Sequence, residues 1–184
     1  MTILSELKAY RDVPFQSVSS PVRVVRDYVS AGSSLGGGRM SINLDLAGRC
    51  YDVESVVLEN DWFRASVLPS VGAKIHDLLW KPTGRNILWH KPRILPQAFP
   101  VDGNSDDHWC GGWDEGFPTY DPCEYRGEQY PALGELRSVK WHVQATGEDG
   151  EKAFVKLFAF GPTSPVRAKK TVTLMTSSPV LRVH

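Results

Sequence analysis

Short apolar runs separated by turn residues constrain the fold of this chain more than any other feature of its sequence. The runs lie at residues 54–59, 62–68, 73–80, 87–90, 135–144, 153–160, 168–175 and from 180 onward. Asn60-Asp61, Pro69 and the segment 81–84 supply turns between the first of them. Runs this short, with turns this regular, are typical of antiparallel hairpins. The sequence therefore predicts an all-β fold.

Residues 1–50 differ from this pattern. Segment 4–10 predicts a short helix, 22–28 predicts a strand, and 31–39 is rich in glycine. A glycine-rich loop that holds phosphate is normally followed by Lys-Ser or Lys-Thr, and that pair is absent here. We interpret residues 1–50 as an N-terminal extension with a glycine-rich linker or hairpin turn, and residues 51–184 as the β domain.

The end of the chain alternates apolar and polar residues from Val180 to His184 and then stops. An antiparallel sheet does not usually end with an incomplete strand that no later strand pairs with. We expect a sandwich that is incomplete at its C-terminus, with a terminal edge strand as the alternative.

Composition removes several classes of protein. The formal net charge is zero, with 21 basic and 21 acidic residues, whereas proteins that bind nucleic acids usually carry a basic surplus. No apolar stretch predicts a signal peptide or a membrane span. Cys50, Cys110 and Cys123 form no CxxC pair, and reduced thiols in the cytoplasm are the simplest account of them. We expect a cytoplasmic protein without nucleic-acid or membrane partners.

Segment 91–130 is rich in proline, glycine and aspartate, and loops this long inside a β domain are usually functional or disordered. Its tryptophans favour an ordered loop. It contains the run His-Trp-Cys-Gly-Gly-Trp-Asp-Glu-Gly-Phe-Pro at residues 108–118. A sugar ring has apolar C–H faces and a rim of hydroxyl groups, so it suits aromatic faces beside carboxylates. The run therefore predicts a sugar site.

Five residues are candidates for contact with that sugar. Trp109 and Trp113 would form a stacking platform, and Asp114 and Glu115 would accept hydrogen bonds from hydroxyl groups. His90, at the start of the long loop, would reach the same cleft. The alternatives are that the tryptophans belong to the core and that the carboxylates lie in a solvated turn or pair with Arg126 or Arg137.

Several segments together resemble the galactose mutarotase (aldose 1-epimerase) superfamily. Residues 57–75 resemble its opening strands, and residues 81–89 resemble its hairpin leading to a tryptophan. Gly111-Gly112-Trp113 with Phe117-Pro118 is similar to a segment of the hexose-phosphate epimerase branch, and residues 131–135, followed by Trp141, resemble Pro-x-His-Gly-Glu…Trp. The resemblance covers residues 51–184 and implies an antiparallel β-sandwich of the supersandwich type, in a longer chain.

Two positions depart from the family pattern. Leu133 stands where the family has a histidine before Gly-Glu, and Cys110 stands where one branch has an arginine before Gly-Gly. Exchange at an anomeric carbon needs a base and an acid, and the family's base comes from a later half that this sequence does not contain. We expect His108 to replace the missing histidine as the acid, and Glu135 to line the site as in the family. The alternative for His108 is a surface histidine.

These features predict a carbohydrate-active protein that acts on the anomeric centre of a sugar or sugar derivative, without a cofactor. Because Leu133 cannot transfer a proton, a non-catalytic carbohydrate-binding module is the alternative. A third possibility is a fragment that pairs with a second copy or with another chain through its open C-terminal edge. The acidic segment 102–107 lacks the spacing of a calcium-binding EF-hand, so we expect no metal site.

Overall fold

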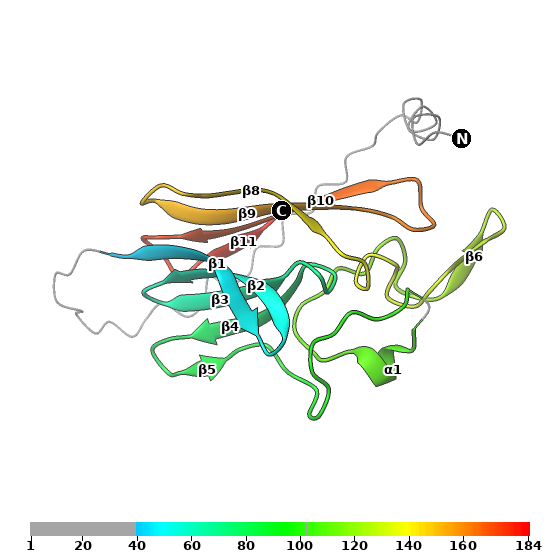
Figure 1. The fold of residues 1–184 in the computed structure, drawn as a ribbon, viewed down its shortest axis with the longest axis horizontal. Helices are drawn as coiled ribbons and strands as arrows, with labels where there is room; N and C mark the ends of the chain where they lie inside the picture. Colours follow the sequence, from blue (N-terminus) through cyan, green and yellow to red (C-terminus); the bar gives the residue numbers. More distant parts are fainter. Residues whose placement is uncertain (1–39, 102) are drawn as a thin grey trace.

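The computed structural model describes residues 40–101 and 103–184, drawn in colour in Figure 1. The helix expected at 4–10, the strand at 22–28 and the glycine-rich segment 31–39 all lie outside the described residues, as does Asp102. No helix in the described part of the chain is long and apolar enough to span a membrane.

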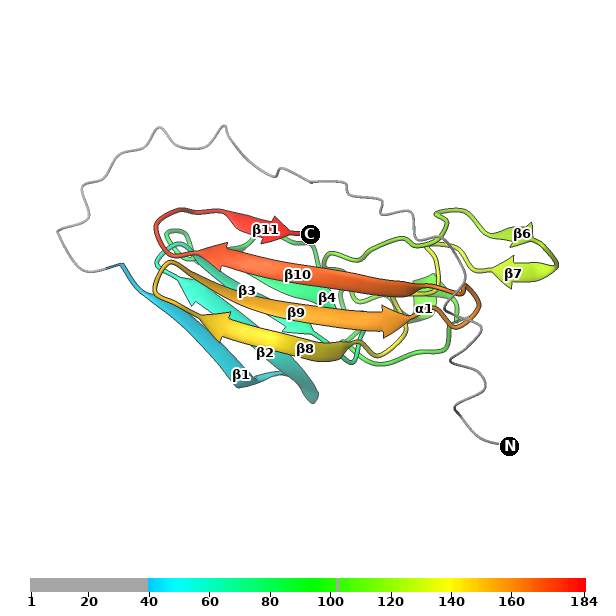
Figure 2. The same cartoon turned by 90° about the horizontal axis from the view of Figure 1, so that it is seen from above.

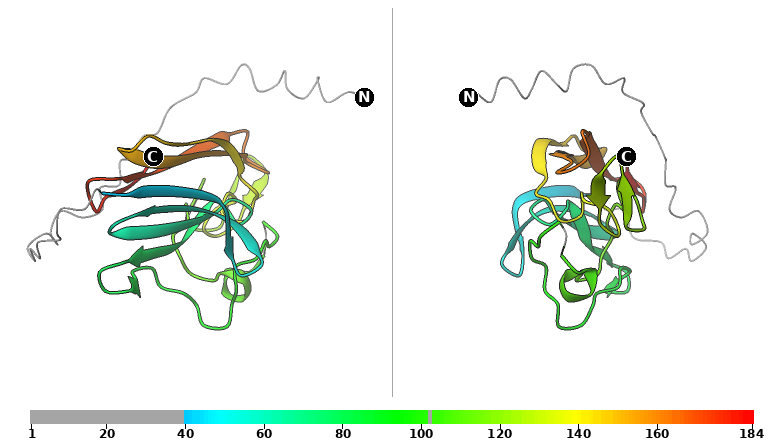
Figure 3. Two further views of the ribbon diagram at one scale, coloured as in Figure 1. Left: turned by 60° about the vertical axis from the view of Figure 1, so that its left-hand side comes forward. Right: turned by 90° about the vertical axis from the view of Figure 1, so that its right-hand side faces the viewer.

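Two antiparallel sheets make up the body of the protein. The first has the strand order β1-β2-β3-β4-β5, and the second has the order β11-β10-β9-β8. The first contains β1 (Ile42–Cys50), β2 (Val53–Asn60), β3 (Phe63–Leu68), β4 (Lys74–Trp80) and β5 (Arg85–Asn86). The second contains β8 (His142–Glu148), β9 (Lys152–Phe160), β10 (Arg167–Met175) and β11 (Leu181–Val183). Figures 1 and 3 show the sheets as two layers, face to face.

The long segment between the sheets carries little regular structure. It contains the short helix α1 (Ser105–His108) and a hairpin of β6 (Cys123–Tyr125) and β7 (Glu128–Tyr130). Figure 2 shows this hairpin projecting from one end of the sandwich. The segment packs against the end of the sandwich and does not extend either sheet beyond isolated bridges.

Alternation of side chains along the strands builds the core between the sheets. In β9, Ala153, Val155, Leu157 and Ala159 are buried, and the residues between them lie on the outer face. Because successive side chains of a strand point to opposite faces, this period of two places one apolar row against the first sheet. That sheet contributes buried residues from three strands: Leu58, Val67 and Ile75. The all-β sandwich predicted from the sequence is confirmed.

Three boundaries differ from those predicted. The first sheet includes β1, which lies before the domain boundary expected at residue 51. Its alternation is interrupted by a register shift between Asp45 and Gly48, and most of its residues are at least partly exposed, so its sequence shows no apolar run. Only Arg85–Asn86 pairs with β4, in place of the strand expected at 87–90. The strand expected at 135–144 begins at His142, because Leu133 and Gly134 have positive φ angles and turns follow them.

The last strand, β11, pairs with β10 and lies at the edge of the second sheet. The ladder continues past β11 through two hydrogen bonds between the backbones of Thr171 and His184, with N···O distances of 2.7 and 2.9 Å. The strand predicted from Val180 onward is therefore present. Pairing of its outer edge with a second copy stays a prediction.

Asn60 joins the two sheets at one end of the sandwich. Its side chain has no solvent exposure, and its amide nitrogen donates to the carbonyl oxygens of Met175 at 2.7 Å and Ser178 at 3.2 Å. Its amide oxygen accepts from the backbone N–H groups of Trp62 at 2.9 Å and Phe63 at 2.6 Å. The Asn60 side chain therefore provides hydrogen-bond partners for backbone groups at the turns that follow β2 and β10.

We expect Asn60→Ala to lower the free energy of unfolding by about 2–4 kcal/mol, because it leaves buried backbone groups without partners. Urea unfolding followed by tryptophan fluorescence measures the change. Ser41→Ala is the control, since it removes only an exposed hydrogen bond of 2.7 Å to Asp61 and should change stability by less than about 0.5 kcal/mol. Equal stability of Asn60→Ala and the unmodified chain would contradict this role.

Candidate functional site

A pocket of about 410 Å³ lies in the long segment beside the first sheet. Two tryptophans, a carboxylate and a guanidinium contribute to its wall, together with apolar side chains and backbone. The lining residues are Leu88, Trp109, Gly112, Trp113, Asp114, Gly116, Tyr120, Leu133 and Arg137.

The glycine pair places the pocket wall against β4. Gly111 and Gly112 have φ angles of 94° and 86°, a region that residues with a Cβ rarely adopt. A Cβ on Gly112 would lie only 2.8 Å from the carbonyl oxygen of Ile75. This close approach allows Trp113 and Ile75 to exchange two backbone hydrogen bonds, of 2.9 and 3.1 Å. The segment therefore runs beside β4, and its position is fixed by backbone contacts.

Two buried lysines hold the carboxylates that follow the glycines. The Lys74 side chain is 2% exposed, and its ammonium group donates to Asp114 Oδ2 at 2.5 Å and to the Gly111 carbonyl at 2.7 Å. The Lys170 side chain is 3% exposed and donates to Glu115 at 2.8 Å and to the Ala73 carbonyl at 2.8 Å. Both carboxylates thus belong to ion pairs with the sandwich.

Asp114, which lines the pocket, has one carboxylate oxygen without a partner among the described residues. Its Oδ2 also accepts from Trp109 Nε1 at 2.9 Å. Its Oδ1 is buried and accepts no hydrogen bond from the described residues. A buried carboxylate oxygen without a partner is costly to fold, so it marks a position where a ligand hydroxyl group would gain a strong hydrogen bond.

Arg137 adds a positive charge to the same wall. The residue is 3% exposed, and its guanidinium lies 5.3 Å from the centre of the Phe99 ring. Burial lowers the pKa of Arg137, and the negative charge of Asp114 acts in the opposite direction. An arginine keeps its charge even when its pKa falls, so the pocket contains one charge of each sign among its described lining residues.

Aromatic and aliphatic surfaces complete the pocket. The Trp109 ring lies 5.5 Å from the Trp89 ring, tilted by 31°, and the Trp113 side chain packs against the core. Tyr120, which is 73% exposed, and Leu133 also belong to the lining. The pocket therefore combines apolar faces with a few polar groups, as small-molecule sites generally do.

Of the residues expected from the sequence, the pocket brings together Trp109, Trp113 and Asp114. Glu115 lies next to them but is engaged by Lys170. His90 stacks on His76, with ring centres 4.1 Å apart, and its Nε2 lies 2.8 Å from the His76 carbonyl. His90 is therefore absent from the described lining.

The two expected catalytic residues lie elsewhere. The His108 ring stacks on Phe99 at 5.4 Å, and its Nδ1 is buried without a hydrogen bond from the described residues. Glu135 has no solvent exposure, and its carboxylate accepts from the backbone N–H groups of Thr163 at 2.8 Å and Ser164 at 3.1 Å. Glu135 thereby holds the loop between β9 and β10, which is a structural task.

Sequence reasoning missed Arg137 and Tyr120 as parts of the pocket. Arg137 entered only as a general ion-pair partner of the carboxylates, and Tyr120 lies in a stretch without periodicity. The sequence signal that could have identified Arg137 is its position two residues after Gly134-Glu135. The family resemblance had already placed that segment at the site.

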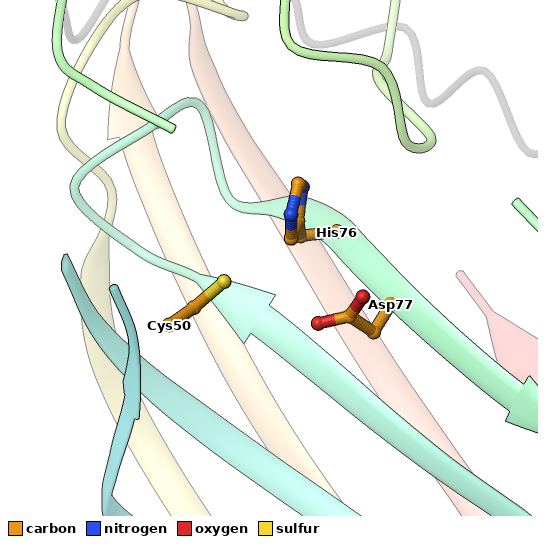
Figure 4. A group of neighbouring side chains, drawn as sticks. All are labelled: Cys50, His76 and Asp77. Carbon is orange, nitrogen blue, oxygen red and sulfur yellow. The ribbon is translucent and has the colours of Figure 1, made fainter. Parts of the chain in front are cut away.

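A second group of polar side chains lies outside the pocket. Ligand atoms of Cys50, His76 and Asp77 are all within 4.8 Å of one another, as Figure 4 shows. Burial, with the nearby Asp77 carboxylate, raises the pKa of the Cys50 thiol to about 11. Burial also lowers the pKa of His76 below its usual value.

Comparison with known proteins finds structural likeness only. No protein-family model matches the sequence, and no curated protein matches it. Among solved structures, a putative mutarotase (YeaD) from Salmonella typhimurium is 20% identical, with a TM-score of 0.46 over 73% of this chain and 43% of its own. Galactose mutarotase-like proteins from Clostridium acetobutylicum and Lactobacillus casei are 14% and 16% identical, with TM-scores of 0.43 and 0.41.

The same two proteins are matched over 77% and 70% of this chain and over 46% and 42% of their own. The chain thus spans less than half the length of each of these three proteins. At identities of 14–20%, this likeness concerns the fold alone.

We expect Glu135→Gln to lower the free energy of unfolding by about 1–3 kcal/mol, because an amide NH₂ would face the backbone donors of the 163–164 turn. Chemical unfolding at equilibrium measures the loss. Glu124→Gln is the control, because that carboxylate is exposed and accepts from Gln129, at 2.8 Å, on the β6–β7 hairpin. A Glu135→Gln chain of unchanged stability would contradict the structural role.

Proposed function

We propose that the pocket binds a monosaccharide or a sugar derivative. The observation that carries the proposal is the free acceptor Oδ1 of Asp114, which belongs to a pocket wall shared with the indole rings of Trp109 and Trp113. An indole face suits the C–H face of a sugar ring, and a carboxylate oxygen suits a hydroxyl group. Arg137 supplies a donor on the same wall, for a hydroxyl, carboxylate or phosphate group of the ligand.

The size of the pocket supports a ligand of this class. Small-molecule sites usually enclose about 300–1,000 Å³. A pocket of 410 Å³ lies at the lower end of that range and suits a single sugar ring better than a long oligosaccharide.

The cellular setting is part of the same proposal. Cys50, Cys110 and Cys123 are all free thiols, which favours a reducing compartment such as the cytoplasm.

The direct test is a thermal melt of the full chain with a panel of aldoses, uronates and hexose phosphates. Because only binding to the native state raises the midpoint, one sugar class should shift it and the others should not. If only uronates or hexose phosphates raise the midpoint, Arg137 would be assigned as the partner of the ligand's carboxylate or phosphate group. A cooperative melt that no sugar in the panel shifts would contradict the proposal.

A substitution then places the ligand in the pocket. We expect Trp109→Leu to weaken binding of the shifting sugar at least about tenfold, or about 1.4 kcal/mol, because it removes a stacking face. Isothermal titration calorimetry measures the dissociation constant. Trp62→Leu is the matched control, since Trp62 lies in the turn between β2 and β3 and is absent from the pocket lining. Equal losses in both variants would argue against binding in this pocket.

Acid/base chemistry at the anomeric carbon of the bound sugar is a second candidate. It is favoured by two buried proton-transfer atoms that have no partner among the described residues: Oδ1 of Asp114, a lining residue, and Nδ1 of His108, which precedes the lining residue Trp109 in the chain. In this scheme Asp114 takes the proton of the C1 hydroxyl group, and protonated His108 gives its proton to the ring oxygen as the ring opens. The His108 ring would have to turn from Phe99 toward the pocket.

For this candidate, we expect the unmodified chain to accelerate anomer exchange of the bound sugar, and His108→Gln to slow that exchange about 100-fold or more. Exchange spectroscopy by NMR on an equilibrium mixture of anomers measures the rate. His142→Gln is the control, because His142 lies on β8 and stacks on Phe158, in the second sheet. Sugar binding without any acceleration by the unmodified chain would leave a binding module and exclude the enzyme.

A further inference from the structure

Three donor atoms of different chemistry converge outside the sugar pocket. They are the Cys50 sulfur at the end of β1, a His76 ring nitrogen and an Asp77 carboxylate oxygen on β4, all within 4.8 Å of one another. Figure 4 shows the Cys50 sulfur and the Asp77 carboxylate turned toward each other, with the His76 ring beside them. Strand β1 and strand β4 are not neighbours in the sheet, so folding alone brings these residues together.

Neighbouring groups fix the orientation of these side chains. Asn86 Nδ2 donates to Asp77 Oδ1 at 2.7 Å, and the His76 ring stacks on His90 with an angle of 2° between the planes. Cys110 Sγ lies 3.9 Å from His76 Nδ1. Groups that hold ligand side chains in place are a regular feature of metal sites, where they set the ring orientation and the affinity.

We propose that Cys50, His76 and Asp77 bind a thiophilic divalent transition-metal ion, with Zn²⁺ as the ion that fits best. A thiolate, an imidazole and a carboxylate are all ligands of zinc, whereas calcium and magnesium prefer sites made only of oxygen. This proposal does not rest on the proposed sugar binding, and none of the three ligands lines the sugar pocket.

The spacing is close to what zinc requires. Zinc lies about 2.3 Å from a thiolate and about 2.0–2.2 Å from nitrogen or oxygen, so its tetrahedral ligands stand about 3.3–3.7 Å apart. The upper limit of 4.8 Å in this structure needs a closure of about 1 Å, which rotation of the Cys50 and Asp77 side chains supplies. Binding releases the thiol proton to solvent and leaves the thiolate on the metal.

Burial determines how an ion reaches the site, and the number of protein ligands determines how many coordination positions stay open. His76 is 3% exposed, whereas the Asp77 side chain is 26% exposed, so an ion can enter from the carboxylate side. Three protein ligands leave one position of a tetrahedral ion for water. An ion bound here would cross-link β1 to β4 and would stabilise the folded chain by mass action.

Cobalt titration of the reduced full-length chain tests the site, because Co²⁺ replaces Zn²⁺ and a thiolate ligand gives it a sulfur-to-metal charge-transfer band in the near ultraviolet. We expect one ion per chain, the band in the unmodified chain and in Cys123→Ser, and loss of the band in Cys50→Ser. Cys123 is the matched control, since it is an exposed free thiol on β6. Excess Zn²⁺ should then displace the cobalt and remove the band.

A second variant keeps the test decisive if Cys50→Ser folds poorly. Asp77→Asn preserves the oxygen that accepts from Asn86 and should weaken Zn²⁺ binding by about 10–100-fold or more, as measured by competition with a chelating dye. Zn²⁺ should raise the thermal midpoint of the unmodified chain more than that of Asp77→Asn. A folded unmodified chain that binds no cobalt, a band that survives Cys50→Ser, or a band that disappears in Cys123→Ser would each overturn the proposal.

Discussion

The ion pairs Lys74–Asp114 and Lys170–Glu115 are the interactions on which the pocket depends. Removing a charge from water is costly, so a buried lysine is tolerated only where carboxylates and carbonyl groups satisfy its donors. Each of these two lysines meets that condition with one carboxylate and one backbone carbonyl. The lysines come from β4 of one sheet and β10 of the other, while both carboxylates come from a single loop. The loop is therefore bound to both sheets of the sandwich. These contacts fix the position of the pocket wall that this irregular segment forms.

Strand β4 serves both proposed sites with consecutive residues. Lys74 holds the pocket wall through Asp114, and His76 and Asp77 belong to the candidate metal site. The segment that begins at Cys110 lies beside both, because its sulfur is 3.9 Å from His76 and the next residue, Gly111, accepts from Lys74. A metal ion at His76 would thus stiffen the same strand and segment that position Asp114. This arrangement offers a physical route by which metal binding would change sugar affinity without any contact between the two ligands.

Sequence patterns predicted the features that residues close together in the chain form. They did not predict contacts between segments that are far apart in the chain. The strand runs and the cluster Trp109, Trp113 and Asp114 lie within short stretches, so their neighbours in sequence are also neighbours in space. Glu135 was assigned to the site from its motif, but its carboxylate is satisfied by backbone donors near residue 163, which no spacing around it reveals. The Cys50–His76–Asp77 group was missed for the same reason, since its members come from strands that are not neighbours in the sheet. Strand β1 was missed because its exposed residues and its register shift hide the alternation.

Leu133 decides how far the family chemistry can be transferred. It stands where the resembled family has a proton-transferring histidine, and it lines the pocket at a φ angle of 61° with its N–H bonded to the Tyr120 carbonyl at 2.7 Å. An aliphatic side chain there adds apolar surface to the wall formed by Leu88 and the two tryptophans. The same substitution that removes a catalytic group thus improves the fit for the C–H face of a sugar. Glu135 is held in a loop contact, so Asp114 is the only carboxylate among the described lining residues. The pocket therefore keeps the groups that binding needs but lacks a second carboxylate for acid/base chemistry. This composition favours the proposed sugar binding over the proposed catalysis.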